Sequence, residues 1–490
     1  MSEKASGNQK NISWYMHSVI VFLFVFGFGQ LPALEPLTPV GMQLVGIFIG
    51  VIWGWSTVGM IWPSLLGLIA LSFTELTSMT QLLAIGFGTD VFPFMILMFT
   101  VMKLIEGNGV ASWIANKVLS VRFLKGKPWL FIFMILLCTY IVSGFAGGPF
   151  LAAMMFWSIF YGVFQATGYK PYDKFSTLMI IGTMFAACLA LVIMPFKGNA
   201  IVLVQTFNTL TGMEIDFLKY ECLVIPTSIL VILTYVLICR FVFRVDVSAL
   251  KNFDINNGTF FDKNSLTLNK KQKISLVMLL AVLAIMMAPS ILPSSWMITQ
   301  ILVGLGMTGR FAVIAIIVCI IRVDGEPLLD FGKIASNAVM WDAMFLAAFI
   351  IPMSSLLTAD ATGVKPFLVT VLSPILAGHS LLVFTALLLI LAAVLTNIAN
   401  NGVIAIILMS VVVSFTEQMG IDPTGVCILL MLCVQMALVT PAASPFAAIL
   451  FGNKDWIKPK DIYFYGTISI FICTIVMIIV GYFLVTILFY

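Results

Sequence analysis

The sequence contains few charged residues, few histidines and no paired cysteines. Only 9% of its 490 residues are Asp, Glu, Lys or Arg, whereas a soluble domain has about 25%. This scarcity excludes a soluble globular protein, and a formal net charge of +4 does not indicate a nucleic-acid partner. The two histidines and eight cysteines include no CxxC motif, so neither a metal site nor a disulfide framework is supported.

Motifs for catalysis and for nucleotide binding are also missing. The sequence has no His-Glu-x-x-His, no pair of membrane aspartates, no Ser-His arrangement and no P-loop. Ser143 and Lys197 would suit a Ser/Lys dyad, but the helix breaks described below explain both residues without one. We therefore expect neither an enzyme nor an ATP-driven pump. A channel is not favoured, because no carbonyl-filter or charged-ring pattern is present.

Apolar residues make up 61% of the chain. A run of about 20 such residues crosses the hydrocarbon core of a bilayer as a helix, and the sequence predicts about 11 of these spans. The fold class expected is an all-α polytopic membrane protein. We expect residues 1–13 to form a cytoplasmic tail. The apolar run 14–31 is expected to be a retained first span, because no small-residue cleavage site follows it.

Two apolar runs, 128–165 and 380–415, are too long for a single span. As one helix each would measure about 55 Å. Small and polar residues interrupt both runs near the centre: Ser-Gly-Phe-Ala-Gly-Gly-Pro at 143–149 and Thr-Asn-Ile-Ala-Asn-Asn-Gly at 396–402. We therefore predict a re-entrant hairpin in each run, made of two short helices.

A broken span follows each predicted hairpin. The span 175–208 is interrupted at 194–199, and the span 424–452 is interrupted at 440–445. Backbone without helical hydrogen bonds at membrane depth must be satisfied by protein or by a water-filled cavity. Matched interruptions in two halves of a membrane chain point to a transporter's binding site.

These interruptions divide the chain into two repeats. We expect a first repeat at 14–244, a polar cytoplasmic linker at 245–272 and a second repeat at 273–490. With the N-terminus in the cytoplasm, most of the 25 Lys and Arg lie at cytoplasmic ends, as the positive-inside rule requires. The repeats then have inverted topology, and the C-terminus lies outside the cell (plasma) membrane.

The interruptions also supply the candidate site. Half-helix N-termini direct partial positive charge at a break and suit an anion such as a carboxylate. Glycines permit close backbone approach, although tight helix packing is an equal explanation for them. Gln205 and Gln435 are weaker candidates, since helix–helix hydrogen bonding explains them as well. The candidate substrate-binding residues are Ser143, Gly147, Gly148, Pro149, Lys197, Asn199, Thr396, Asn397, Asn400, Asn401, Gly402, Thr440, Ser444 and Pro445.

Lys197 lies mid-span in an apolar stretch, between Pro195 and Gly198. Ionisable residues inside a membrane usually face a cavity and mark a transport pathway. Three roles remain open for this lysine. It is a fixed cation at the site, a titrating group that couples transport to protons, or a side chain that extends to an interface.

Residues 440–452 carry the sharpest motif, Thr-Pro-Ala-Ala-Ser-Pro-Phe-Ala-Ala-Ile-Leu-Phe-Gly. It resembles the P-x-x-T-P-P-N-A-I-x-F-G signature of the divalent-anion:sodium symporter family, which transports di- and tricarboxylates and sulfate. The resemblance implies a homodimer with a scaffold part and a transport part that moves by an elevator-like step. Ser444 stands in place of Thr, and the matching residues are Pro441, Pro445, Ala448, Ile449, Phe451 and Gly452.

The family's hairpin tips carry Ser-Asn-Thr, and this chain departs from that pattern. The first tip has Gly-Gly-Pro at 147–149 and the second has Asn-Asn-Gly at 400–402. In the first broken span, Phe-Lys-Gly-Asn at 196–199 replaces Thr-Pro-Pro-Asn. The resemblance implies a sodium ion near Asn400, Asn401 and Ser444. A first sodium site near Gly148 and Asn199 has lost side-chain oxygens, and Lys197 is our candidate to replace that ion.

Together these features predict a secondary active transporter, a symporter or an exchanger, of small organic anions, with di- or tricarboxylates as the first choice. The alternatives in the same superfamily are a carrier of sulfate or another small solute, and a cation–proton antiporter. No cofactor is expected, apart from Na+ or H+ as a coupling ion. The expected partners are a small anionic substrate, the lipid bilayer and a second copy of the chain.

Overall fold

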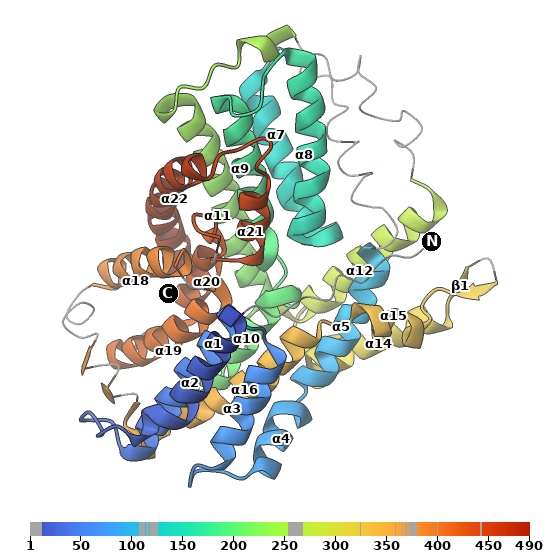
Figure 1. Ribbon diagram of the computed structural model, residues 1–490. Helices are drawn as coiled ribbons and strands as arrows, with labels where there is room; N and C mark the ends of the chain where they lie inside the picture. The colour runs from blue at the N-terminus through green and yellow to red at the C-terminus, as the bar shows by residue number, and fades with distance from the viewer. Residues whose placement is uncertain are drawn as a thin grey trace, which may run out of the picture. The chain divides into compact units, whose positions relative to one another are not determined.

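The structure is a computed structural model that describes residues 12–490 with several gaps (Figure 1). The gaps are 107–112, 114–116, 118–125, 253–267, 324, 358, 365, 368–369, 372–379, 399 and 442. Most of the expected N-terminal tail and the middle of the expected linker at 245–272 lie outside the described residues.

The chain divides into two compact units, and each unit takes residues from both halves of the sequence. Unit 1 consists of residues 1–92 and 340–374, and unit 2 consists of residues 93–339 and 375–490. The helices of unit 1 are α1 (Ile12–Phe22), η1 (Leu23–Gly27), η2 (Phe28–Gln30), α2 (Pro39–Thr57), α3 (Ile61–Ser72), α4 (Met79–Gly88), α16 (Trp341–Leu357) and η10 (Asp360–Thr362).

Unit 1 is built around α2, which packs against α1, η1 and α3. Its glycines recur every fourth residue on one buried face, at Gly46, Gly50 and Gly54. A Cβ atom added to Gly46 would lie 2.6 Å from the Cβ of Phe28, and one added to Gly50 would lie 2.6 Å from Val25 Cγ2. Small residues at this spacing allow helices to approach closely where hydrocarbon provides no hydrophobic drive between them.

Unit 2 holds the remaining elements. Its first half contains α7 (Pro128–Val142), η4 (Ser143–Gly147), α8 (Gly148–Thr167), α9 (Lys174–Leu189), η5 (Ala190–Val192), α10 (Gly198–Thr211), α11 (Phe217–Leu237), η6 (Ile238–Val242) and η7 (Ser248–Asn252), preceded by α5 (Val91–Glu106), which begins at the unit boundary. Next come α12 (Lys270–Ile291), α13 (Met297–Gly304), α14 (Gly306–Ile320), a two-stranded hairpin of β1 (Arg322–Val323) and β2 (Glu326–Pro327), and α15 (Phe331–Ala338). The last are α18 (Leu381–Thr396), α19 (Asn401–Met419), α20 (Thr424–Cys433), η11 (Val434–Met436), α21 (Pro445–Gly452) and α22 (Pro459–Leu488).

Two helices form the interior of unit 2. Every residue of α9 from Phe175 to Leu189 is buried, and every residue of α20 is buried as well. The helix α9 packs against α7 and α8, and α20 packs against α11, α18, α19 and α22. Both interior helices therefore have largely apolar sequences without a polar face, as expected of helices that are buried on all sides.

Polar side chains and glycines set many helix ends. Asp216 begins α11, because its carboxylate accepts hydrogen bonds from the N–H groups of Leu218 and Lys219. Asn269 and Gln272 form a reciprocal capping box at the start of α12. The helices α8, α10 and α19 end at Gly168, Gly212 and Gly420, all in the left-handed conformation that glycine adopts without a Cβ penalty.

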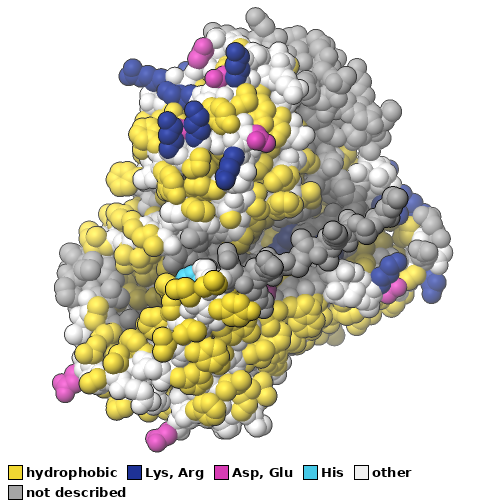
Figure 2. Space-filling model, in the orientation of Figure 1, with side chains coloured by type: hydrophobic (Ala, Val, Ile, Leu, Met, Phe, Trp, Pro, Cys, Tyr) yellow, Lys and Arg dark blue, Asp and Glu magenta, His cyan; other side chains and the backbone are white. Residues whose placement is uncertain are grey.

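The fold is that of an all-α polytopic membrane protein, as predicted. In the described part of the chain, 10 helices are long and apolar enough to cross a membrane, or up to 12 if each bent pair is one span. One such pair is α13 and α14, which is bent by 102° at the break between them. Hydrophobic side chains cover much of the face shown in Figure 2, as expected of helices that contact lipid.

Three loops of unit 2 meet at one end of the helices. The backbone N–H of Tyr172 donates to the carbonyl of Trp456 (3.0 Å), and the hydroxyl of Tyr169 donates to the carbonyl of Asp246 (2.9 Å). Lys and Arg gather at this end in Figure 2. The basic residues of these three loops and their flanks are Lys170, Lys174, Arg240, Arg244, Lys454, Lys458 and Lys460.

Candidate functional site

All the candidate residues belong to unit 2, where four helices begin at a break. In the first half, η4 separates α7 from α8, and residues 193–197 separate η5 from α10. In the second half, residues 397–400 separate α18 from α19, and residues 437–444 separate η11 from α21. The helix α7 packs against α8, and α18 packs against α19. Each predicted hairpin is thus a packed helix pair with a break between its helices.

One hydrogen bond recurs in both halves and connects a hairpin tip to the neighbouring broken span. The hydroxyl of Ser143 donates to the carbonyl of Ala187 (2.7 Å), and the hydroxyl of Thr396 donates to the carbonyl of Val434 (3.0 Å). Both hydroxyl-bearing residues are buried. A bond to the last turns of α9 in one half and to η11 in the other fixes where each tip lies against its span.

This shared bond places the two halves in register. The N-cap position of the second hairpin helix comes four positions after the hydroxyl donor in both halves, at Gly147 and at Asn400. The N-cap position of the second part of the broken span comes ten positions after the acceptor in both halves, at Lys197 and at Ser444. Lys197 therefore corresponds to Ser444, one position away from the alignment expected from the family motif.

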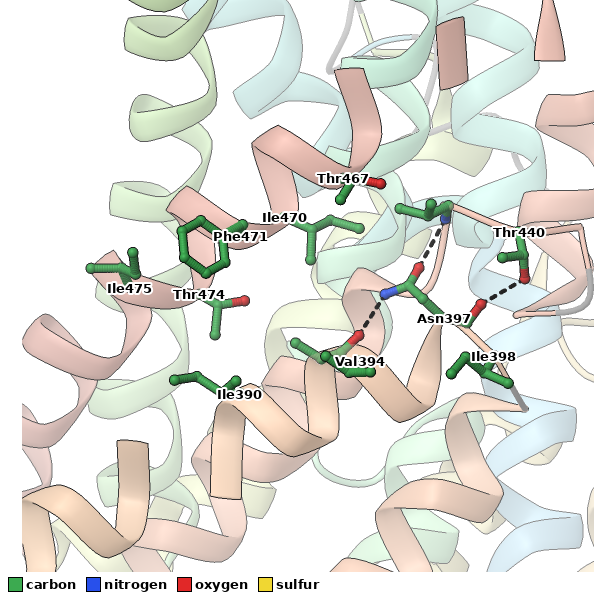
Figure 3. Close-up of a pocket in the computed structure, with 12 residues that line it drawn as sticks. Ile390, Val394, Asn397, Ile398, Thr440, Thr467, Ile470, Phe471, Thr474 and Ile475 are labelled. Atoms are coloured by element: carbon green, nitrogen blue, oxygen red, sulfur yellow. Dashed lines mark hydrogen bonds between the residues drawn. The ribbon is translucent and has the colours of Figure 1, made fainter. Parts of the chain in front are cut away.

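In the second half, Asn397 joins the hairpin tip to the unwound backbone of the broken span (Figure 3). Its Nδ2 donates to the carbonyls of Ala393 (2.8 Å) and Met436 (3.2 Å). Its Oδ1 accepts from the N–H groups of Leu438 (3.0 Å) and Val439 (2.8 Å). The hydroxyl of Thr440 then donates to the Asn397 carbonyl (2.6 Å). One buried amide thus pairs backbone that α20 and η11 no longer pair.

The other two asparagines of this tip act at the start of α19. Asn400 caps the helix, and its Oδ1 accepts from the N–H groups of Gly402 (3.0 Å) and Val403 (3.4 Å). The side chain of Asn401 donates to Gln435 Oε1 (3.1 Å), a hydrogen bond between the tip and η11. Gln435 is thus engaged in helix–helix hydrogen bonding, the second of the two roles considered for it.

Ser444 supports the break on its other side. Its hydroxyl donates to the carbonyl of Ala437 (2.8 Å) and accepts from the N–H of Ala447 (3.1 Å), so it both caps α21 and holds the unwound segment. Pro445 follows in the first turn of α21, where a fixed φ and a missing N–H are tolerated. Pro149 holds the same place in α8.

At the hairpin tip, the first half has glycine at each position where the second half has asparagine. The register sets Gly144, Gly147 and Gly148 opposite Asn397, Asn400 and Asn401. A Cβ atom on Gly144 would lie 2.3 Å from Ile193 Cγ2, so close packing explains that glycine. Gly148 has open space around it but a φ of +69°, so its backbone conformation is the reason for glycine there.

Lys197 extends to the hairpin tip of its own half. Its backbone begins α10, and its Nζ donates to the carbonyl of Gly144 (3.1 Å). The side chain is half-buried, and its ammonium lies against the tip rather than at the far end of the apolar segment. The Gly144 carbonyl corresponds to the Asn397 carbonyl, which accepts from Thr440. The amino group of Lys197 therefore lies in the first half where the second half has the hydroxyl of Thr440.

The side chain of Asn199 lies outside the described part of the structure, so its candidate role is not tested. Among the described residues, no three His, Cys, Asp or Glu side chains converge on a point that could hold a metal ion. Neutral carbonyl, amide and hydroxyl oxygens are the groups that the breaks offer to a cation. These are hard oxygen ligands of the kind that alkali and alkaline-earth ions prefer.

Sequence reasoning missed the backbone partners of the site. The carbonyls of Ala187, Val434 and Gly144 each accept a side-chain hydrogen bond across a break. The residue types alanine, valine and glycine do not predict that their carbonyls accept these bonds. The one available signal was the pair of hydroxyl residues, Ser143 and Thr396, which stand at the same place in the two tip motifs.

The fold and the paired breaks define the class: a polytopic membrane protein with interrupted helices. The family model described as the sodium:sulfate symporter transmembrane region matches residues 10–490. The chain therefore belongs to the sodium:sulfate symporter family, which confirms the resemblance seen in residues 440–452. No curated protein sequence matches the chain.

A solved structure supports the same fold. The YdaH transporter of Alcanivorax borkumensis, whose crystal structure is described as revealing an unusual topology, matches with a TM-score of 0.54. The two chains are 13% identical, and the match covers 96% of this chain and 98% of that one. At this identity the likeness concerns the fold alone.

Proposed function

We propose that the protein is a secondary active transporter of di- or tricarboxylates that bind at the two pairs of breaks in unit 2. The observation that carries the proposal is the register of the two halves, each tied by a hydroxyl-to-carbonyl bond across a break. The halves also touch, because α10 packs along α19 and α9 packs against η11. Two similar half-sites suit a substrate with two similar anionic ends.

Helix ends and one side chain supply the positive potential. The helices α8, α10, α19 and α21 all begin at a break, and each N-terminus carries a partial positive charge of about half a unit at most. Lys197 adds a full charge beside the first tip. Broken helices that turn their N-termini to an anionic group are a recurring device of membrane transporters. The substrate-binding residues are those of the two tips and the two caps.

Lys197 is proposed to replace a cation in the first half-site. An ammonium 3.1 Å from a carbonyl oxygen occupies the kind of position that a bound sodium ion would take. The second half keeps neutral oxygens, from Asn400, Asn401 and Ser444, for a sodium ion. The family's name supports sodium as the coupling ion. We therefore expect transport to need one sodium fewer than two complete half-sites would bind, with protons as the alternative coupling ion.

Sulfate is the second candidate substrate, and the description of the matching family favours it. Sulfate carries two charges on one compact group, so a single half-site can satisfy it. A dicarboxylate carries its charges on separate groups, which suits two half-sites. The choice between them follows from measuring both in the same preparation.

Several further features belong to the proposal. All candidate residues lie in unit 2, so one compact body can carry the site in an elevator-like step. The basic loops that meet at one end of unit 2 support a cytoplasmic position for that end. A homodimer in the plasma membrane, with the C-terminus outside, completes the proposal.

Uptake into proteoliposomes tests the function. Radiolabelled succinate, citrate and sulfate are compared under an inward sodium gradient, under an inward proton gradient, and with unlabelled anion inside and no gradient. Sodium-driven uptake of succinate or citrate is the expected result, and counterflow alone would identify an exchanger. Uptake of sulfate alone would select the second candidate. No uptake of any of the three would refute the proposed substrates.

The role of Lys197 has its own test. Lys197→Gln removes the amino group. It is expected to lower the rate of uptake at least tenfold, or to increase the number of sodium ions on which the rate depends. Lys174→Gln is the matched control, because that lysine also begins a helix and donates to a carbonyl, that of Phe243 (3.0 Å), outside the breaks. Unchanged rate and sodium dependence in Lys197→Gln would remove the special role of this residue.

A further inference from the structure

Unit 2 contains an apolar pocket of about 290 Å³ beside the second hairpin tip (Figure 3). Its walls are α18, the unwound backbone after η11 and the middle of α22. Apolar side chains such as Ile390, Val394 and Phe471 form most of its surface. No Asp, Glu, Lys or Arg lines it, so it does not suit an anionic substrate, whose burial without a partner charge is costly.

The mouth of the pocket faces outward from unit 2. Val394 is 54% exposed and Phe471 is 60% exposed. Both lie on strongly apolar helices, and α22 is 30 residues long, enough to cross a membrane. Exposed apolar side chains in the middle of a spanning helix contact hydrocarbon. The pocket is therefore supplied from the lipid phase rather than from water.

Four polar side chains line this pocket, Asn397, Thr440, Thr467 and Thr474, and the last of them is buried without a partner. Thr474, in the middle of α22, is 2% exposed, and its hydroxyl has no hydrogen-bond partner in the described structure. Figure 3 shows that side chain directed at the space between α22 and α18. Thr183 and Thr206 of unit 2 donate to the carbonyl four residues earlier, whereas Thr177, Thr227 and Thr385 share the lack of a partner with Thr474. A buried hydroxyl without a partner destabilises the fold, and a ligand with one polar group would supply the partner.

We propose that the pocket binds an uncharged amphiphile dissolved in the bilayer, of the class of medium-chain alcohols. Its chain fills the apolar space and its hydroxyl pairs with Thr474. An ordinary phospholipid acyl chain would leave Thr474 without a partner, and a charged headgroup would find no partner charge.

The site has a regulatory consequence that rests on the proposed function. The innermost wall of the pocket includes Asn397 and Thr440, the residues that join the second hairpin tip to the broken span. A molecule packed against this junction favours one position of the tip. Occupancy is therefore expected to slow transport.

Photolabelling tests the site without requiring transport. The purified full chain in nanodiscs is irradiated with a diazirine-bearing octanol, and the adducts are mapped by mass spectrometry. Adducts are expected on α18 and α22 at the pocket residues and are expected to fall when 1-octanol is added. Labelling spread evenly over all apolar helices, or insensitive to 1-octanol, would overturn the proposal.

Two variants sharpen the test. Thr474→Val keeps the side-chain shape but removes the hydroxyl, and should weaken competition by 1-octanol about fivefold, the equivalent of one hydrogen bond of about 1 kcal/mol. Ala393→Leu fills the pocket and should abolish the adducts. Thr486→Val is the matched control, because this half-buried threonine of α22 donates to the carbonyl of Phe483 and lies outside the pocket.

Each result has a distinct meaning. If Thr474→Val and Ala393→Leu both label as the wild type does, the site is refuted. If labelling behaves as expected but no anion is transported, the result supports the binding site in the pocket and refutes the proposed transport function. If labelling holds and 1-octanol leaves active uptake unchanged, the regulatory consequence alone is refuted.

Discussion

Replacing Asn397 by alanine should loosen the second break more than any other single change in the site. The buried Asn397 side chain, only 8% exposed, satisfies four backbone groups. Alanine would leave the N–H groups of Leu438 and Val439 without an acceptor. Each buried donor without a partner costs about 1–3 kcal/mol, so the break should lose about 2–6 kcal/mol.

Hydrogen exchange measures this loss directly. A loss of 2 kcal/mol at a locally opening segment raises the exchange rate roughly 30-fold, since each 1.4 kcal/mol is a factor of ten. We expect that rise or more at Leu438 and Val439 in Asn397→Ala, detected by mass spectrometry of peptides that cover residues 437–444. Asn397→Asp retains an acceptor for both N–H groups and should keep them protected.

Asn337→Ala is the control for the substitution itself. Asn337 is exposed on α15, and its amide donates only to Ser336 (3.2 Å) and Lys333 (3.4 Å) nearby. Its removal should change stability by less than about 0.5 kcal/mol. If exchange at Leu438 and Val439 in Asn397→Ala stays within threefold of the wild type, the amide does not hold the break and the reasoning fails.

Two further predictions concern the ends of the same helices and use melting in detergent, followed with a thiol dye because most of the free cysteines are buried. Gly148→Ala should destabilise the protein by about 1–3 kcal/mol, because a φ of +69° with a ψ of 172° is accessible almost only to glycine. A Cβ atom added to Gly402 would lie 3.5 Å from its nearest neighbour, Asn400 Oδ1, so Gly402→Ala should melt close to the wild type. Equal melting temperatures for Gly148→Ala and Gly402→Ala would contradict this account. Ser444→Ala removes a helix cap and the bond to Ala437, and should lose about 0.5–2 kcal/mol. Ser444→Thr should restore most of that loss, and a loss shared by both variants would show that the hydroxyl is not the cause.

Much of the fold was predictable because it depends on local properties of the sequence. The length of an apolar run decides whether a helix crosses a bilayer, so the all-α polytopic class followed from hydropathy. Glycine, proline and asparagine in the middle of such a run oppose a continuous helix, and the breaks before Gly148, Gly198, Asn401 and Pro445 lie at these residues. The family was predictable from the short motif at 440–452.

The site was predictable only as a set of segments. The repeated order of four interrupted segments along the chain predicted that they form one site. These segments are 143–149, 194–199, 396–402 and 440–445. Whether the repeats 14–244 and 273–490 are inverted in a membrane remains a prediction. The compact units of the structure instead combine residues from both halves, because packing depends on which faces meet and not on the order of the chain.

The sequence by itself determined the class of protein, the apolar spans and the positions of the breaks, since each depends on residues that are neighbours in the chain. Tertiary structure decided which atoms meet at those breaks. Lys197 bonds to Gly144, 53 residues away, and Thr396 bonds to Val434, 38 residues away. The acceptors are backbone carbonyls, which every residue has, so only packing selects one of them. For the same reason only the folded chain shows Thr474 directed into an apolar pocket.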